Sequence, residues 1–102
     1  MSAVTYLEAI GQAIREEMQR DDAVFMLGED VGNYGGAFKV SAGLLEEFGS
    51  ERVIDAPMAE DAIIGSAVGA ALMGMRPIAE MQFIDFITCG FDQIINLSLI
   101  HI

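Results

Sequence analysis

The sequence predicts an α/β domain in which helices cover both faces of a parallel sheet. Short apolar runs alternate with segments of helical period along the whole chain, and strands that are buried on both faces have such continuous apolar character. Acidic and aromatic side chains gather where the predicted strands end. With 102 residues, the chain has room for one domain of this kind.

The first predicted element is a helix over residues 5–21. Its apolar positions repeat on one helix face, at Leu7, Ile10, Ile14 and Met18. Thr5 and Glu8 have the spacing of a capping box, which satisfies free amide groups at a helix start. Residues 24–27 then predict a buried strand.

The middle of the chain predicts a loop, a short helix and a second strand. Glycines crowd residues 28–36, which is typical of a loop. Residues 41–48 predict a helix that ends at Gly49. Residues 53–54 predict a strand, which Pro57 ends.

The last third predicts a long apolar helix, a third strand and a final helix. Residues 60–75 are almost wholly apolar, so we expect this helix to be buried on most sides. Arg76 and Pro77 break it. Residues 78–83 predict a strand with Glu80 in its middle, where a carboxylate needs a partner, and residues 85–96 predict a helix.

Composition excludes several classes of function. The net charge is −11 with only five basic residues, so we expect no nucleic-acid partner and no anionic membrane surface. A single cysteine allows no internal disulfide. The amino terminus matches neither a signal nor a transit peptide, and no apolar stretch is long enough to cross a bilayer, so we expect a cytoplasmic protein.

Glu60 is the first candidate for chemistry, because ligands of parallel sheets gather at the carboxyl ends of the strands. These ends fall at residues 28–29, 55–60 and 83–86. A carboxylate at a helix start can simply favour the helix dipole. It can also be a buried carboxyl group that shares a proton with a ligand. The sequence leaves both interpretations open.

The other candidates also have a plain structural interpretation. Glu29 and Asp30 can belong to a solvated loop, and Phe83 and Phe86 can belong to the core. We expect Cys89 to be a buried apolar residue rather than a nucleophile. We also expect four methionines to fill gaps in the core, namely Met58, Met73, Met75 and Met81. The sequence has no zinc-ligand spacing, phosphate-binding loop or nucleophile elbow.

Several motifs together resemble the beta subunit of the decarboxylating component of 2-oxoacid dehydrogenase complexes. They are Gly28-Glu29-Asp30-Val31, Gly35-Gly36-Ala37-Phe38-Lys39-Val40, Arg52-Val53-Ile54-Asp55-Ala56-Pro57-Met58-Ala59-Glu60, Gly69-Ala70-Ala71, Gly74-Met75-Arg76-Pro77-Ile78 and Phe91-Asp92-Gln93-Ile94-Ile95-Asn96. The resemblance covers residues 3–96. We therefore assign residues 1–96 to a truncated pyrimidine-binding domain. We expect residues 97–102 to be a tail foreign to the family, from a truncated or artefactual reading frame.

The resemblance implies a transketolase-like fold and a thiamine diphosphate site. Glu60 matches the glutamate that hydrogen-bonds a ring nitrogen of the cofactor's aminopyrimidine and thereby activates the thiazolium carbon. Phe86 matches the aromatic residue that packs against that ring. Glu29 matches an acid close to the cofactor, and Gln82 is expected to line the same pocket. Ala56 and Met58 depart from the threonine and isoleucine of many relatives.

The implied reaction is oxidative decarboxylation of a 2-oxoacid, pyruvate or branched-chain, with acyl transfer to a lipoyl carrier. The implied partners are an alpha subunit in an alpha2-beta2 tetramer and a lipoyl-bearing acyltransferase core. Magnesium and the diphosphate bind the alpha subunit through a Gly-Asp-Gly motif absent here, so we expect no metal ligand in this chain. We expect the chain alone to be inactive.

Two alternatives remain open. The first is the beta subunit of an acetoin dehydrogenase, which uses the same glutamate on another substrate. The second, from another class, is a non-catalytic module in which the helix with Gly65 and Gly69 serves only subunit packing.

Overall fold

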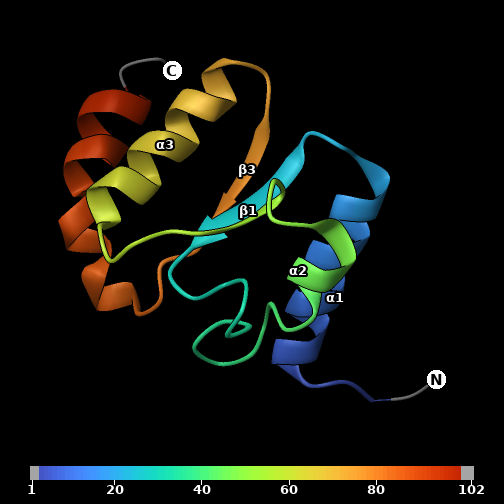
Figure 1. The fold of residues 1–102 in the computed structure, drawn as a ribbon. Coiled ribbons are helices and arrows are strands. Elements are labelled where there is room, and N and C mark those ends of the chain that lie inside the picture. Colours follow the sequence, from blue (N-terminus) through green and yellow to red (C-terminus); the bar gives the residue numbers. More distant parts are fainter. Residues whose placement is uncertain (1–2, 100–102) are drawn as a thin grey trace.

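A computed structural model describes residues 3–99 of the chain. It has three layers, with a parallel three-stranded sheet of order β2-β1-β3 between helices on both faces (Figure 1). The predicted fold class is confirmed. The elements are α1 Tyr6–Arg20, β1 Val24–Gly28, α2 Leu44–Phe48, β2 Val53–Asp55, α3 Glu60–Leu72, β3 Arg76–Ala79, the 3₁₀ segment η1 Ile84–Gly90 and the π-helical segment η2 Gln93–Ser98.

Strand β1 is the centre of the fold, because it pairs in parallel with both neighbours and all five of its residues are buried. Met26 lies opposite Val53 on one side and Ile78 on the other. Successive side chains point to opposite faces. Met26 accordingly packs beneath α1 and α2, whereas Phe25 and Leu27 pack beneath α3.

Helix α1 begins as predicted but buries less of its apolar face than expected. Thr5 accepts from the Glu8 amide at 3.1 Å, and the Glu8 carboxylate accepts from the Thr5 amide at 2.8 Å, which completes the capping box. Met18 is fully buried and Ile14 packs beside it. Leu7 and Ile10 stay exposed, because only the carboxyl-terminal half of α1 lies over the core.

Helix α3 is not buried on most sides, contrary to the prediction. Only Ile63 and Ala67 are buried, on the face that meets the sheet. The rest of α3 is exposed or partly buried, and its exposed apolar residues include Leu72 at 57 %. Three of the methionines predicted as core filler are exposed as well, namely Met58, Met73 and Met75. No helix in residues 3–99 is long and apolar enough to span a membrane.

The third strand lies earlier than predicted and is shorter. It begins at Arg76 and ends at Ala79, so Pro77 is inside it rather than before it. A proline is tolerated there because β3 is an edge strand, where a missing amide donor disrupts no further pairing. Glu80 consequently follows the strand. The helical stretch predicted over residues 85–96 is confirmed, but its helices η1 and η2 are of the 3₁₀ and π type.

Arg52 ties the start of the sheet to the end of α1. Its guanidinium group donates to the carbonyl oxygens of Met18, Asp21 and Val24, at 2.6, 3.0 and 2.8 Å. These carbonyls lie at the carboxyl-terminal end of α1, in the following turn and at the start of β1. The partly buried cation therefore fixes the direction in which the chain enters the central strand.

Candidate functional site

Three glutamates meet at the edge of the sheet where the strands end. Glu29 directly follows β1, Glu80 directly follows β3, and Glu60 opens α3. Parallel strands bring their carboxyl ends to one edge, which explains why residues so far apart in sequence come together. We call Glu29, Glu60 and Glu80 the acid cluster.

Glu29 is the buried centre of the acid cluster. Its side chain is only 8 % exposed, so the interpretation as part of a solvated loop is wrong for Glu29. Burial raises the pKa of Glu29, and the charge and hydrogen bond of the Glu60 carboxylate raise it further, with a smaller effect of Asp30. Glu29 therefore retains a proton more readily than a free glutamate.

Glu60 is partly buried at the first position of α3. The preceding residue, Ala59, has no side chain that could cap the helix. The Glu60 carboxylate lies close enough to Glu29 for its charge to raise the pKa of Glu29. The place of Glu60 at the helix start suits the helix dipole, and its charge acts on the neighbouring Glu29 carboxyl group.

Glu80 is the member of the acid cluster that the sequence did not connect with the others. Its Oε2 atom is buried and has no hydrogen-bond partner within residues 3–99, so the partner expected for its carboxylate is missing at that atom. Burial raises the pKa of Glu80, and the charge of Glu29 raises it further. Two neighbouring acids thus have raised proton affinity for the same physical reasons.

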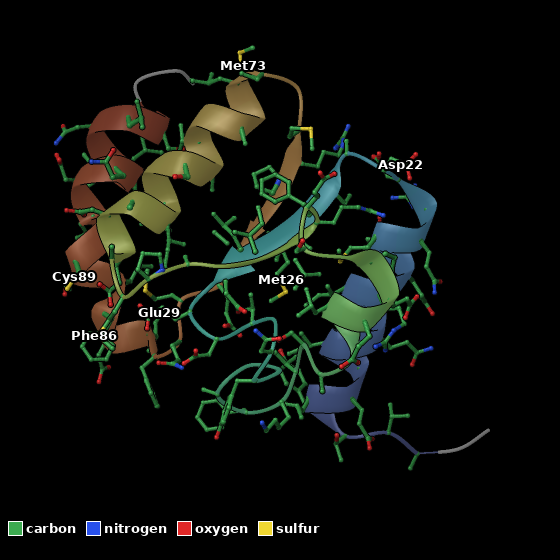
Figure 2. All side chains as sticks on the ribbon, in the orientation of Figure 1. Asp22, Met26, Glu29, Met73, Phe86 and Cys89 are labelled. Atoms are coloured by element: carbon green, nitrogen blue, oxygen red, sulfur yellow. The ribbon has the colours of Figure 1, made fainter. Side chains whose placement is uncertain are left out.

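Phe83 and Phe86 form an exposed aromatic cluster beside the same end of the sheet, together with Phe38. The Phe38 and Phe83 rings meet edge to face at 5.7 Å, and the Phe83 and Phe86 rings do so at 6.4 Å. Phe83 and Phe86 are each 48 % exposed, so core packing is the wrong interpretation. Figure 2 shows Glu29 and Phe86 toward the same end of the molecule.

Two further predicted residues have a less definite place. Gln82 is partly buried two residues beyond Glu80, and no contact joins it to the acid cluster in the described residues. Cys89 is exposed rather than buried, because its side chain lies on the outer side of η1 (Figure 2).

The loop that follows Glu29 is held by Asp55, a residue that the sequence did not single out. The two carboxylate oxygens of Asp55 accept from the amides of Gly32 and Asn33, at 2.6 and 3.2 Å. The Ser41 hydroxyl also donates to the Val31 carbonyl oxygen at 2.8 Å. The sequence did contain a signal for this role of Asp55, namely an acid at the end of a strand in a chain with a glycine-rich loop. Such loops expose free amides that a carboxylate can accept from.

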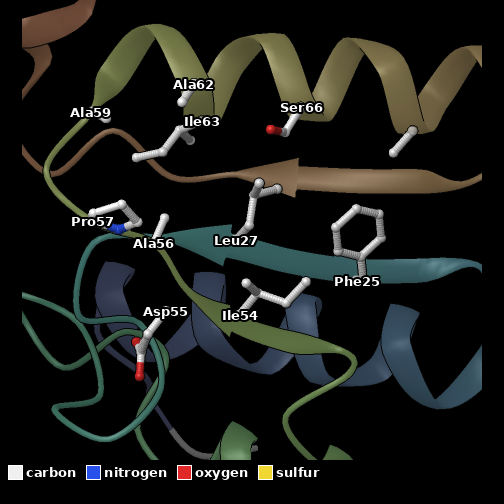
Figure 3. A pocket seen from close by; sticks show the side chains of 11 residues that line it. Phe25, Leu27, Ile54, Asp55, Ala56, Pro57, Ala59, Ala62, Ile63 and Ser66 are labelled. Atoms are coloured by element: carbon white, nitrogen blue, oxygen red, sulfur yellow. The ribbon is translucent and has the colours of Figure 1, made fainter.

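One groove of the described residues is lined by no member of the acid cluster. It has a volume of about 410 Å³ and runs between β1, β2 and the inner face of α3 (Figure 3). Its lining is mostly apolar and includes Ala56, while no glutamate lines it. Asp55 is the carboxylate in this lining.

The residues at the end of the sheet fit one end of thiamine diphosphate. A carboxyl pair that shares protons suits a heterocyclic ring nitrogen, and the exposed Phe86 ring can stack on an aromatic ring. The ammonium group of Lys39, beyond the glycine-rich loop, donates to the Tyr34 carbonyl oxygen at 2.5 Å. No cluster of three or more metal-ligating side chains occurs among the described residues. The acid cluster and the Phe86 ring thus suit the pyrimidine end of the cofactor.

Comparison with known proteins agrees with this geometry. The family model described as "Transketolase, pyrimidine binding domain" matches residues 2–101. Over 96 residues the chain is 60 % identical to the 2-oxoisovalerate dehydrogenase subunit beta of Bacillus subtilis (strain 168), covering 94 % of this chain and 29 % of the relative. It is 50 % identical over 96 residues to the pyruvate dehydrogenase E1 component subunit beta of Acholeplasma laidlawii, with the same coverage.

The mitochondrial pyruvate dehydrogenase E1 component subunit beta of Bos taurus is 50 % identical over 93 residues, which cover 91 % of this chain and 26 % of the relative. The chain thus spans less than a third of the length of these three relatives. The resemblance deduced from the sequence motifs is confirmed. Because the family model covers nearly all of the sequence, the chain belongs to the transketolase pyrimidine-binding domain family.

Proposed function

We propose that this chain is the pyrimidine-binding part of a beta subunit in the decarboxylating component of a 2-oxoacid dehydrogenase complex. The observation that carries the proposal is the place of the buried Glu29 and of Glu60 together at the carboxyl ends of the strands. The relatives are named for 2-oxoisovalerate and pyruvate. The proposed reaction is oxidative decarboxylation of a branched-chain 2-oxoacid or pyruvate, with acyl transfer to a lipoyl carrier.

Glu60 is the proposed catalytic residue. Its carboxyl group hydrogen-bonds the aminopyrimidine ring and holds or releases a proton at that bond. The buried Glu29 supports this role, because its raised proton affinity limits the negative charge beside the ring. General acid–base assistance of this kind contributes roughly 10²–10⁴-fold in rate.

Phe86 and Gln82 are proposed to complete the cofactor contacts of this chain. The exposed Phe86 ring packs against the aminopyrimidine and so orients it toward Glu60, while Gln82 lines the pocket. When bound, thiamine diphosphate supplies the electron sink for loss of carbon dioxide. Its diphosphate and magnesium are assigned to the alpha subunit.

The proposed assembly is an alpha2-beta2 tetramer in the cytoplasm, docked on a lipoyl-bearing acyltransferase core. The exposed apolar surface of α3 supports burial against further protein, because contiguous apolar surface is rare on monomers. The names of the relatives favour a 2-oxoacid dehydrogenase over an acetoin dehydrogenase. The subunit-packing module remains the alternative from another class.

The test is an assay of the full-length beta subunit co-expressed with its alpha subunit. Substrate-dependent reduction of an artificial electron acceptor is measured with pyruvate, a branched-chain 2-oxoacid or acetoin, with and without thiamine diphosphate and magnesium. We expect activity on one of the 2-oxoacids that needs the cofactor and collapses in Glu60→Gln.

Asp61→Asn is the matched control, because Asp61 is an exposed acid in the same first helical turn. It should retain activity. An assembled protein that is inert on all three substrates, or indifferent to Glu60→Gln, would instead support the packing module.

A further inference from the structure

Glu80 is wedged between the end of β1 and the glycine-rich loop. Its amide donates to the Leu27 carbonyl oxygen at 2.9 Å. A Cβ atom added at Gly28 would lie 2.9 Å from the Glu80 Cβ, and one added at Gly36 would lie 3.7 Å from the Glu80 Oε1. The absence of side chains at these two glycines thus makes room for the Glu80 side chain beside residue 29.

The surroundings of this side chain disfavour a negative charge. The Glu80 Oε2 atom is buried without a hydrogen-bond partner in residues 3–99, and a buried unpaired oxygen costs far more free energy when it is ionised. The charged groups of the neighbouring elements are mostly acids, namely Glu29, Asp30, Asp55 and Glu60. The cation among them is Lys39, whose ammonium group donates to the Tyr34 carbonyl oxygen. Burial and the Glu29 charge accordingly raise the pKa of Glu80.

We propose that Glu80 is a positioning residue: packed against Gly28 and Gly36, with its Oε2 atom buried and unpartnered in the described residues, it acts as an uncharged acid beside Glu29. The inference rests on the proposed function of the Glu29–Glu60 pair and adds a residue with a distinct pH signature. When Glu80 ionises, a second charge appears beside Glu29 and disturbs the pair. Wild-type activity should therefore fall on the alkaline side as Glu80 loses its proton.

The experiment uses the full-length subunit assembled with its alpha subunit and compares four variants with wild type. Glu80→Gln keeps the shape and removes the titration, whereas Glu80→Ala removes the packing as well. Glu46→Gln is the control, because Glu46 is an exposed carboxylate on α2. Glu60→Gln tests the proposed function separately. The values of kcat and KM are measured from roughly pH 6 to pH 9.

We expect Glu80→Gln to keep kcat within about twofold at neutral pH and to move the alkaline limb upward by about one pH unit or more. Glu80→Ala should lose kcat on the order of tenfold, because Glu29 loses its support. The loss should be absent in the glutamine variant, which restores the shape. Glu46→Gln should follow the wild-type profile.

A second readout needs neither substrate nor cofactor. The folded-state pKa of Glu80 is raised, so wild type is most stable below the ordinary carboxyl range and loses stability as the pH rises through the raised pKa. The melting temperature of Glu80→Gln relative to wild type should therefore increase with pH, by about 2–4 °C. Glu46→Gln should show no such trend.

A Glu80→Gln variant with wild-type stability but a tenfold lower kcat at neutral pH would overturn the proposal, because it would show that the charge is required. Parallel melting curves against pH, or an unchanged alkaline limb, would overturn it as well. Indifference of the enzyme to Glu60→Gln would refute the proposed function instead, and the melting curves would still decide the state of Glu80.

Discussion

The close approach at Gly28 allows one substitution to be predicted in detail. Gly28→Ala would place a methyl group 2.9 Å from both the Glu80 Cβ and the Val31 Cγ1, and 3.1 Å from the Glu80 carbonyl oxygen. One of these contacts is backbone, so the ends of β1 and β3 must separate. Overpacking of this size costs about 1–3 kcal/mol, and each kcal/mol lowers the melting temperature of a domain this small by about 4–8 °C.

Gly69→Ala is the matched control in α3, because a Cβ atom there meets nothing within 4 Å in this chain. Replacing a helical glycine by alanine should stabilise the chain by roughly 0.5–1 kcal/mol. Denaturant unfolding of the two variants of this chain, followed by circular dichroism, should therefore give effects of opposite sign. A Gly28→Ala variant as stable as wild type would refute the tight packing at the acid cluster.

Three further variants test other parts of the fold. Thr5→Ala should cost about 0.5–2 kcal/mol in denaturant unfolding through loss of the capping box, whereas Ser50→Ala, at an exposed site, should have no effect. Arg52→Met should cost about 2–4 kcal/mol in the same assay, because three carbonyl oxygens lose a charged donor. The melting temperature of Glu29→Gln should exceed that of wild type by a margin that grows as the pH rises beyond the ordinary carboxyl range. The reason is that the raised pKa of Glu29 makes wild type lose stability in that direction. A difference in melting temperature that does not depend on pH would contradict the titration of a buried Glu29.

The arrangement of the elements could be predicted because it depends on local patterns. The alternation of apolar runs with helical segments predicted the parallel sheet and the helices on both faces. The Thr5–Glu8 spacing predicted a cap that the structure contains. The bounds of β3 were predicted wrongly because an apolar run does not reveal where strand pairing starts or stops. Arg76 belongs to the strand because it pairs with Val24.

Burial was predicted less well, because it depends on which surfaces meet. Met73 and Cys89 have apolar character but lie on faces that no element of residues 3–99 covers. The same limit applies to the acid cluster. Sequence position marked Glu29 and Glu60 as strand-end residues, but only the tertiary fold places Glu80 beside Glu29. Asp55 was missed because its role depends on two amides more than twenty residues away.

Exchange of the thiazolium C2 proton of bound thiamine diphosphate for deuterium tests the central claim most directly, because it reports cofactor activation without any substrate. The rate is measured by quenched-flow NMR in the assembled full-length protein, for wild type, Glu60→Gln and Asp61→Asn. The proposed role of Glu60 predicts a rate roughly 10²–10⁴-fold lower in Glu60→Gln and a wild-type rate in Asp61→Asn. Equal exchange rates in all three proteins, each with the cofactor bound, would contradict it.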